Sequence, residues 1–313
     1  MRKRQLGKTG IEVSELALGT WGLSGDAYGP VPEAEADRTI DRAVALGITL
    51  FDTADVYAQG GMERKLGKRL PAQRTMVVTK LGTNLDGYPE KNFTSQYLYT
   101  AFERAQDRLK RDCVDIVLLH NPSLASLDND EAFTLMKRLK SEARIRAWGV
   151  SAGSYEVAEK AIDKGCEVLE MAYNCFLFRD VKKLAVKLRT EGVGLLARSV
   201  LGYGLLAGHW TAEREFYPPD HRADRWNQDE LRRRVEQIDA MRAALGGPVP
   251  TLRSVALRYV LQNERVSAAV LGPRNVTQLD QLVRDAGRMP PYLYPPTMAK
   301  LEAALLAHGV TGE

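Results

Sequence analysis

Four polar side chains that could move a proton together lie at the ends of short apolar runs. Asp52, Tyr57, Lys80 and His120 each stand at, or a few residues after, the C-terminal end of such a run. If the runs are strands of one parallel barrel, these ends meet at one mouth, where the active sites of such barrels gather. We therefore expect the four side chains to share a site that gives a proton to a carbonyl oxygen or takes one from an alcohol.

The four residue types suit one another chemically. A free tyrosine has a pKa near ~10, and a nearby cation such as Lys80 lowers that pKa by stabilising the phenolate. Asp52 would keep Lys80 charged, and His120 would orient a substrate oxygen through a hydrogen bond. Taken singly, Asp52 could cap a helix, Lys80 could be solvated and His120 could be structural. Their joint placement on consecutive strands favours the catalytic interpretation.

Eight runs, many rich in β-branched residues, are typical of strands buried on both faces of a parallel sheet. They span residues 16–20, 49–54, 76–81, 114–120, 147–152, 169–174, 194–199 and 267–272. Amphipathic stretches between them predict helices at residues 33–46, after a cap at Thr94, and at 129–144, 154–164, 180–191, 252–262 and 276–284. The alternation admits an open doubly wound sheet or a closed barrel. Eight repeats over this length favour a single α/β domain over residues 1–313, a (β/α)8 TIM barrel.

Several segments lie outside this repeat. Residues 5–14 predict an N-terminal β-hairpin that covers the bottom of the barrel. Residues 232–245 and 296–308 predict extra C-terminal helices. Residues 209–228 form a long connection rich in proline, aromatic and charged residues, and loops of that length are usually functional.

The composition narrows the class of protein. The 313 residues carry a net charge of +4 from 44 basic and 40 acidic residues, too small an excess to indicate nucleic acid. The basic cluster at 232–234 is spaced like a solvated helix face. No apolar run is long enough for a membrane span, and no apolar stretch typical of a signal peptide follows the basic N-terminus. Three cysteines and four scattered histidines give neither a disulfide framework nor a metal site, so we expect a cytoplasmic protein without a metal.

A phosphate site is expected late in the chain. The chain has no G-x-G-x-x-G fingerprint after a strand, which argues against a classical dinucleotide fold. Gly272 and Arg274 follow the eighth strand, and a helix starts just after them. Free N–H groups and a guanidinium there could hold a phosphate, although a plain turn with a surface arginine explains the same residues.

An ordered set of motifs resembles the aldo-keto reductase family over nearly the whole chain, from the hairpin near Leu6 to Leu282. The motifs are residues 51–57 (FDTADVY), 63–67 (ERKLG), 78–80 (VTK), 118–122 (LLHNP), 145–151 (IRAWGVS), 173–174 (YN), 204–208 (GLLAG) and 272–274 (GPR). The resemblance implies NADP(H)-dependent interconversion of an aldehyde or ketone with an alcohol. Tyr57 would be the general acid and base, assisted by Asp52, Lys80 and His120. The partner is then a small-molecule carbonyl or alcohol substrate, bound by a monomer or homo-oligomer, with no nucleic acid and no membrane.

The resemblance also implies binding residues. For the cofactor they are Thr20, Trp21, Asp52, Ser151, Glu170, Arg198, Ser199, Leu201, Gly204, Leu205, Gly272, Arg274 and Gln278. For the substrate they are Trp21, Tyr57, His120 and Asn121. The aromatic residues Tyr28, Phe176, Trp210, Phe216 and Trp226 are further candidates for the pocket, with packing within the loops as the alternative.

Three positions depart from the family pattern. Ala152 replaces an asparagine and Glu170 a glutamine that together with Ser151 hold the nicotinamide carboxamide, and Leu282 replaces an asparagine that contacts adenine. An ionised Glu170 can accept from the carboxamide NH2 but cannot donate to its oxygen. We expect cofactor binding to be retained in a different arrangement. Two other functions stay open: a cofactor-binding regulatory subunit with little turnover, and an aldolase that uses Lys80 as a Schiff base.

Overall fold

Eight parallel strands close into a barrel, as predicted. A computed structural model describes residues 1–85, 90–245, 251–287, 289–290 and 292–313. The strands are β3 (Leu16–Gly19), β4 (Leu50–Asp52), β5 (Met76–Leu81), β8 (Val114–His120), β9 (Ile145–Ser151), β10 (Val168–Ala172), β11 (Gly194–Arg198) and β12 (Val266–Leu271). They close in the order β3-β4-β5-β8-β9-β10-β11-β12, with β12 paired to β3. Each strand lies within two residues of its expected bounds.

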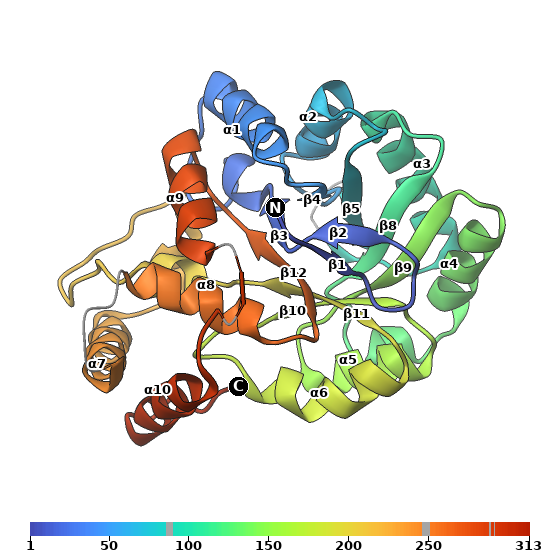
Figure 1. Cartoon of the computed structure of the whole chain (residues 1–313). Helices are drawn as coiled ribbons and strands as arrows, with labels where there is room; N and C mark the ends of the chain where they lie inside the picture. The colour runs from blue at the N-terminus through green and yellow to red at the C-terminus, as the bar shows by residue number, and fades with distance from the viewer. Residues whose placement is uncertain (86–89, 246–250, 288, 291) are drawn as a thin grey trace.

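Helices surround the barrel (Figure 1). They are α1 (Glu33–Ala45), α2 (Gly61–Arg69), α3 (Ser95–Leu109), α4 (Glu131–Ser141), α5 (Tyr155–Asp163), α6 (Arg179–Thr190), α8 (Leu252–Gln262) and α9 (Val276–Ala286). The predicted cap of α3 is confirmed, since the Thr94 side chain accepts from the Tyr97 N–H. Helix α2 was not expected from the sequence, since it is polar and buries only Met62, Glu63 and Leu66. The short pair β6 (Thr83–Asn84) and β7 (Glu90–Lys91) was not expected either.

An N-terminal hairpin closes the bottom of the barrel, as expected. Strands β1 (Lys3–Gln5) and β2 (Glu12–Ser14) pair antiparallel, and Figure 1 shows them lying across the ring of strands. Leu6, Ile11 and Val13 are buried in one cluster with the inward-facing residues of the barrel. Residue 194 must be glycine because Leu6 lies where a Cβ would project. The hairpin therefore acts as an apolar plug.

Two further helices lie outside the ring, α7 (Gln228–Leu245) and α10 (Pro295–Ala307), and they pack against each other (Figure 1). Helix α7 starts four residues before the expected bound, and α10 starts and ends one residue before its own. The connection before α7 contains a short 3-10 turn, η4 (His221–Asp224). In the described parts of the chain, no helix combines the length and apolar composition that crossing a membrane would require.

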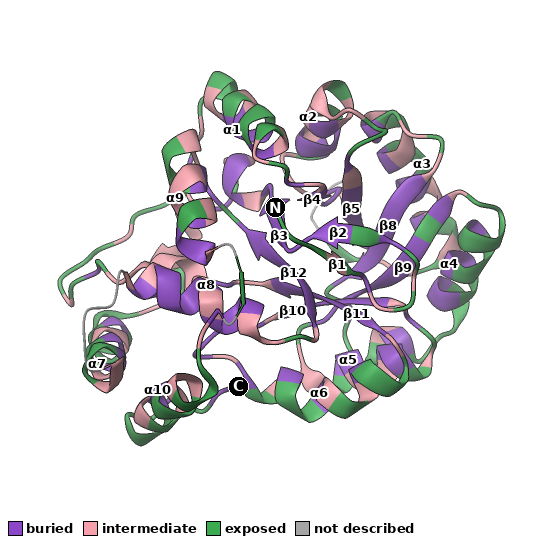
Figure 2. Cartoon of the chain, in the orientation of Figure 1, coloured by how far each residue is buried: buried purple, intermediate pink, exposed green. Residues whose placement is uncertain are grey.

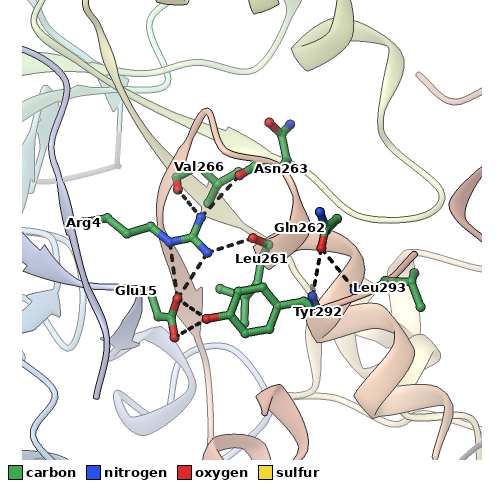
Figure 3. Close-up of polar contacts among 8 residues, drawn as sticks. All are labelled: Arg4, Glu15, Leu261, Gln262, Asn263, Val266, Tyr292 and Leu293. Atoms are coloured by element: carbon green, nitrogen blue, oxygen red, sulfur yellow. Dashed lines mark hydrogen bonds and ion pairs between the residues drawn. The ribbon is translucent and has the colours of Figure 1, made fainter. Parts of the chain in front are cut away.

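Burial follows the expected pattern, with buried strands and helices exposed on their outer faces (Figure 2). One polar cluster lies at the bottom of the barrel (Figure 3). Arg4 donates to the carbonyls of Leu261 (2.7 Å) and Val266 (2.9 Å) and pairs with Glu15 at 3.1 Å. The Tyr292 hydroxyl donates to the same carboxylate at 2.6 Å. We call Arg4, Glu15 and Tyr292 the Arg4 clasp, because they join the hairpin to the C-terminal part of the chain.

Candidate active site

Three adjacent strands deliver an acid, an ammonium and an imidazole to the same end of the barrel. Asp52 ends β4, Lys80 lies one residue before the end of β5, and His120 ends β8. Tyr57 follows in the loop after β4. Its ring centroid lies 5.4 Å from Lys80 Nζ and 6.2 Å from the centroid of the His120 ring. The structure thus brings together the four side chains that the sequence placed in one site.

Lys80 is almost fully buried, and all three of its N–H donors have acceptors. Nζ donates to Asp52 Oδ1 at 2.7 Å, to Asp52 Oδ2 at 2.6 Å and to the Thr53 carbonyl at 3.0 Å. An ammonium has three donors, so this set uses all of them. The side chain is therefore held in one orientation below the mouth of the barrel.

Glu170 places a second carboxylate against the same ammonium. It lies on β10, opposite Ser151 of β9, with a side chain only 3% exposed. Its Oε2 lies 3.3 Å from Lys80 Nζ, and its Oε1 lies 4.0 Å from Arg198 Nε. Among the described residues, neither Glu170 Oε2 nor Arg198 Nε has a hydrogen-bond partner.

Burial and charge set the protonation of this cluster. Burial lowers the pKa of Lys80, but Asp52 and Glu170 outweigh that effect and raise the pKa above its ordinary value. Burial and repulsion by Glu170 raise the pKa of Asp52 to about 8, although Lys80 opposes them. Lys80 therefore stays charged, while the Asp52 carboxyl holds a proton to a higher pH than an exposed aspartate does.

Tyr57 and His120 respond to the same cluster in opposite directions. Burial raises the pKa of Tyr57 above its ordinary value; Lys80 lowers it, as the sequence led us to expect, but does not outweigh burial, and Asp52 and Glu170 raise it further. Burial lowers the pKa of His120 well below its ordinary value, and the cations Lys80, Lys91 and Arg198 lower it further. At neutral pH Tyr57 thus holds its proton and the imidazole of His120 is neutral.

Strained backbone gathers around the mouth. Ala58 and Gln59 after Tyr57, Asn121 after β8, and Ser199 and Tyr203 after β11 all have positive φ between 49° and 59°. This region is sparsely populated by residues other than glycine and often marks functional sites. The Asn121 N–H donates to the Ser151 carbonyl at 3.0 Å, which fixes a predicted substrate residue beside a predicted cofactor residue.

The remaining predicted cofactor residues near the barrel axis lie around this cluster. Thr20 is buried and donates through both its N–H and its hydroxyl to the Asp52 carbonyl, each at 2.9 Å. Arg198 ends β11 and donates to the Ala152 carbonyl at 3.1 Å. Ser199, Leu201, Gly204 and Leu205 form the tight turn and 3-10 segment η3 (Gly202–Ala207) that follow β11.

The expected phosphate site lies at the start of α9, where several groups already have partners, although Arg274 Nε is buried without a hydrogen-bond partner among the described residues. One Arg274 nitrogen donates to the Gly29 carbonyl at 2.9 Å and to the Pro30 carbonyl at 3.1 Å. The Gln278 side chain accepts from the Arg274 N–H. The Val276 N–H donates to Glu35 of α1 at 3.0 Å, and that contact lowers the pKa of Glu35. Gly272 is exposed, and a Cβ there would meet nothing. Leu282, the third departure, is buried in the core.

The predicted pocket aromatics form a connected group. The ring of His221 lies 4.8 Å from Trp21, 4.9 Å from Tyr28 and 5.3 Å from Tyr203. Trp210, Phe216 and Trp226 pack on one another with centroids 5.0 to 6.3 Å apart. These last three therefore pack mainly within their own loop, with Trp226 also 6.2 Å from Tyr203, whereas Trp21 and Tyr28 contact a loop residue from another part of the chain. Phe176 is buried.

Two features of the site were not expected. Lys91 of β7 donates to the His120 carbonyl at 2.7 Å, and no motif marked it. Glu170 was identified only as a departure near the cofactor, not as a neighbour of Lys80. The described residues contain no group of three or more His, Cys, Asp or Glu side chains that could hold a metal ion.

Comparisons with known proteins point to one family. The sequence model of the Aldo/keto reductase family matches residues 15–287. L-galactose dehydrogenase from Arabidopsis thaliana is 29% identical over 294 residues, covering 90% of this chain and 86% of that protein. The aldo-keto reductase YhdN from Bacillus subtilis is 28% identical over 303 residues, covering 92% and 89%.

Two solved structures share the fold over nearly their whole length. The holo form of the aldo-keto reductase AKR11C1 from Bacillus halodurans matches with a TM-score of 0.82 and 25% identity, covering 97% of this chain and 96% of that one. The glycerol dehydrogenase AKR11B4 from Gluconobacter oxydans matches with a TM-score of 0.84 and 23% identity, covering 99% and 96%.

Proposed function

The chain belongs to the aldo/keto reductase family of oxidoreductases, which use nicotinamide cofactors, and from this premise we propose that it interconverts a carbonyl compound and an alcohol with NADP(H). The observation that carries the proposal is the arrangement around Lys80. The buried ammonium of Lys80, held by Asp52, lies 5.4 Å from the centroid of the Tyr57 ring. The His120 ring lies 6.2 Å from the same centroid, in a T-shaped arrangement.

Each residue has a role in the proposed reduction. Tyr57 is protonated at neutral pH and donates its proton to the substrate oxygen as negative charge develops there. Lys80 stabilises the phenolate left behind, and Asp52 keeps Lys80 in place. The neutral His120 donates a hydrogen bond to the same oxygen and orients it. In alcohol oxidation the tyrosine phenolate takes the proton back.

The residues at the mouth fit a nicotinamide carboxamide. Glu170 Oε2 is a buried acceptor and Arg198 Nε a buried donor, and both lack a hydrogen-bond partner among the described residues. A primary amide offers a donor and an acceptor that complement this pair. Arg198 thus supplies the donor that Ala152 and an ionised Glu170 cannot. When bound, the cofactor supplies or accepts the hydride at the carbonyl carbon.

We also propose a class of substrate and a location in the cell. Aromatic aldehydes and aldoses suit the rings of Trp21 and Tyr28 near the mouth, and one relative is an L-galactose dehydrogenase. We propose a cytoplasmic protein because its three cysteines are free. A monomer and a homo-oligomer both fit the proposed chemistry.

The aldolase alternative requires a neutral Lys80 that can attack a carbonyl. The two neighbouring carboxylates raise the pKa of Lys80, which disfavours that role. Borohydride trapping of a substrate on Lys80 would support the aldolase. The regulatory-subunit alternative predicts tight cofactor binding without turnover.

The test is NADPH oxidation, followed by its absorbance, across a panel of aromatic aldehydes, ketones and aldoses. We expect Tyr57→Phe to lower kcat at least ~100-fold, because a positioned acid contributes about 10²–10⁴-fold. Cofactor binding, measured by isothermal titration with NADPH and NADH, should persist in that variant. Undiminished turnover in Tyr57→Phe would refute the proton-donor role, and no binding of either cofactor would refute the redox function.

A further inference from the structure

Two carboxylates share one ammonium in the candidate site, and only one of them is hydrogen-bonded to it. Asp52 accepts two N–H bonds from Lys80. Glu170 Oε2 lies 3.3 Å from the same Nζ but accepts none, because the third donor goes to the Thr53 carbonyl. Glu170 therefore acts on Lys80 through its charge and not as a ligand that fixes its position.

The position of Glu170 is built into the barrel. Its side chain comes from β10 and meets Lys80 of β5, although the two strands are not neighbours in the barrel order. Ser151 on β9 and Leu196 on β11 flank Glu170 in the sheet, so the register of β10 sets the height of Glu170 in the barrel. The interaction crosses the interior in a site with little water, where charges are weakly screened.

We propose that Glu170 acts on Tyr57 through Lys80: its charge, added to that of Asp52, keeps Tyr57 protonated to a higher pH than the charge of Asp52 alone would. This inference rests on the proposed function of Tyr57. Glu170 is a carboxylate at a position where the family pattern has a neutral amide, so the proposed effect is a property of this chain and not of the family.

Four charged side chains act on Tyr57 and on one another around Lys80. Above the pKa of about 8 of Asp52, where Tyr57 would titrate, Asp52 and Glu170 are negative and Lys80 and Arg198 are positive. Arg198 lies 4.0 Å from Glu170 with a partly exposed side chain. His120 on β8 is neutral. Glu170 weakens the stabilisation that Lys80 gives to a phenolate on Tyr57, and it raises the pKa of Tyr57 in the same direction as burial does.

Glu170→Gln removes the charge and keeps the shape. We expect the low-pH limb of kcat/KM for alcohol oxidation and the high-pH limb for carbonyl reduction both to move to lower pH, by about one unit. Glu170→Asp, which keeps a charge, should restore much of the original profile. Asp115→Asn is the matched control, because Asp115 is also a buried, ion-paired carboxylate but lies near the N-terminal end of β8. It should leave both limbs in place.

A second readout does not need turnover. Because the pKa of Asp52 in the folded protein is raised to about 8, the folded state holds a proton there that the unfolded state releases near pH 4. Stability is therefore lost as the pH rises from about 4 to about 8. Removing the Glu170 charge lowers the pKa of Asp52 and reduces this loss. The Tm of Glu170→Gln minus that of the original protein should grow from pH 5 to pH 8.

The outcomes separate this inference from the proposed function. Turnover with unchanged limbs in Glu170→Gln would overturn the inference and leave the reductase intact. No turnover with any substrate would refute the proposed function, and the Tm difference would then decide whether Glu170 couples to Asp52. A Tm difference that is the same at pH 5 and pH 8 would show that Glu170 has only a structural role and does not change the pKa of Asp52.

Discussion

Glu35 and Arg274 place opposite charges beside the first turn of α9. The Glu35 carboxylate accepts from the Val276 N–H, and it therefore occupies the kind of site in which a helix N-terminus holds an anion. Arg274 is bound to two carbonyls of the loop before α1. We propose that the adenosine phosphate of the cofactor binds beside Arg274, where the Glu35 carboxylate would repel it.

Glu35→Gln should therefore shift cofactor preference. We expect the Kd for NADPH to fall about 2- to 5-fold at low salt, because a repulsive charge is removed, while the Kd for NADH stays the same. Isothermal titration at low and high salt measures both. Glu33→Gln, on the same helix and paired with Lys65 at 3.2 Å, is the control and should change neither value. An equal change for NADPH and NADH would place the phosphate elsewhere.

At the scale of elements, the close packing of strands depends on Gly149. It lies on β9 opposite Val168 of β10, and a Cβ would come within 1.7 Å of the Val168 carbonyl oxygen. This oxygen belongs to the backbone of the neighbouring strand, so it cannot yield as the end of a flexible side chain could. The contact lies two residues before Glu170 on β10.

Gly149→Ala should destabilise the barrel by about 3 kcal/mol or more, because overpacking against backbone forces strands apart. Gly153→Ala is the control, since a Cβ there would meet nothing within 4 Å. Urea unfolding followed by circular dichroism compares the two. A Gly149→Ala protein as stable as Gly153→Ala would show that β9 and β10 can separate at no cost.

Elements with a strong sequence pattern were predictable, and those whose formation depends on tertiary contacts were not. The eight barrel strands are short β-branched runs, and their alternation with helices indicated the closed barrel. Helix α2 has a mostly polar sequence with an internal Gly67, which packs on the backbone of α3 at Leu109. Its helical form depends on that contact, which no local pattern encodes.

The same distinction holds within the site. Asp52, Lys80 and His120 could be grouped because they end consecutive strands. The pairing of Glu170 with Lys80 could not, since β10 and β5 are not adjacent strands and the two side chains meet only across the closed barrel. The protonated state of Tyr57 could not be predicted from the sequence either, because burial raises its pKa by more than Lys80 lowers it.

At the scale of the whole molecule, the Arg4 clasp holds the first and last parts of the barrel together. Arg4 and Glu15 are 11% and 3% exposed, so their charges are shielded from water. Removing one partner of such a buried pair leaves the other uncompensated. The Tyr292 hydroxyl would then be the remaining donor to Glu15 among the described residues.

Arg4→Ala should lower the free energy of unfolding by about 3 kcal/mol and Tm by about 5 °C. It should not change kcat/KM at about 25 °C, because the clasp lies at the opposite end of the barrel from Tyr57. Lys3→Ala is the control. Its ion pair with Glu12 has side chains about half exposed, so it should cost less than about 0.5 kcal/mol. Thermal unfolding measures both, and equal losses would show that the clasp adds nothing.

The clasp and the last strand pair of the barrel can form only after nearly the whole chain has been synthesised. Arg4 donates to the carbonyl of Val266, 262 residues later, and β3 pairs with β12. At about 5–20 residues per second, roughly 10–50 s of translation separate the two partners. Throughout that time the nascent chain carries unpaired edges at β3 and at its newest strand, ready to pair with other chains. A chain released before residue 266 keeps both edges open, so we expect such fragments to aggregate or to stay bound to chaperones.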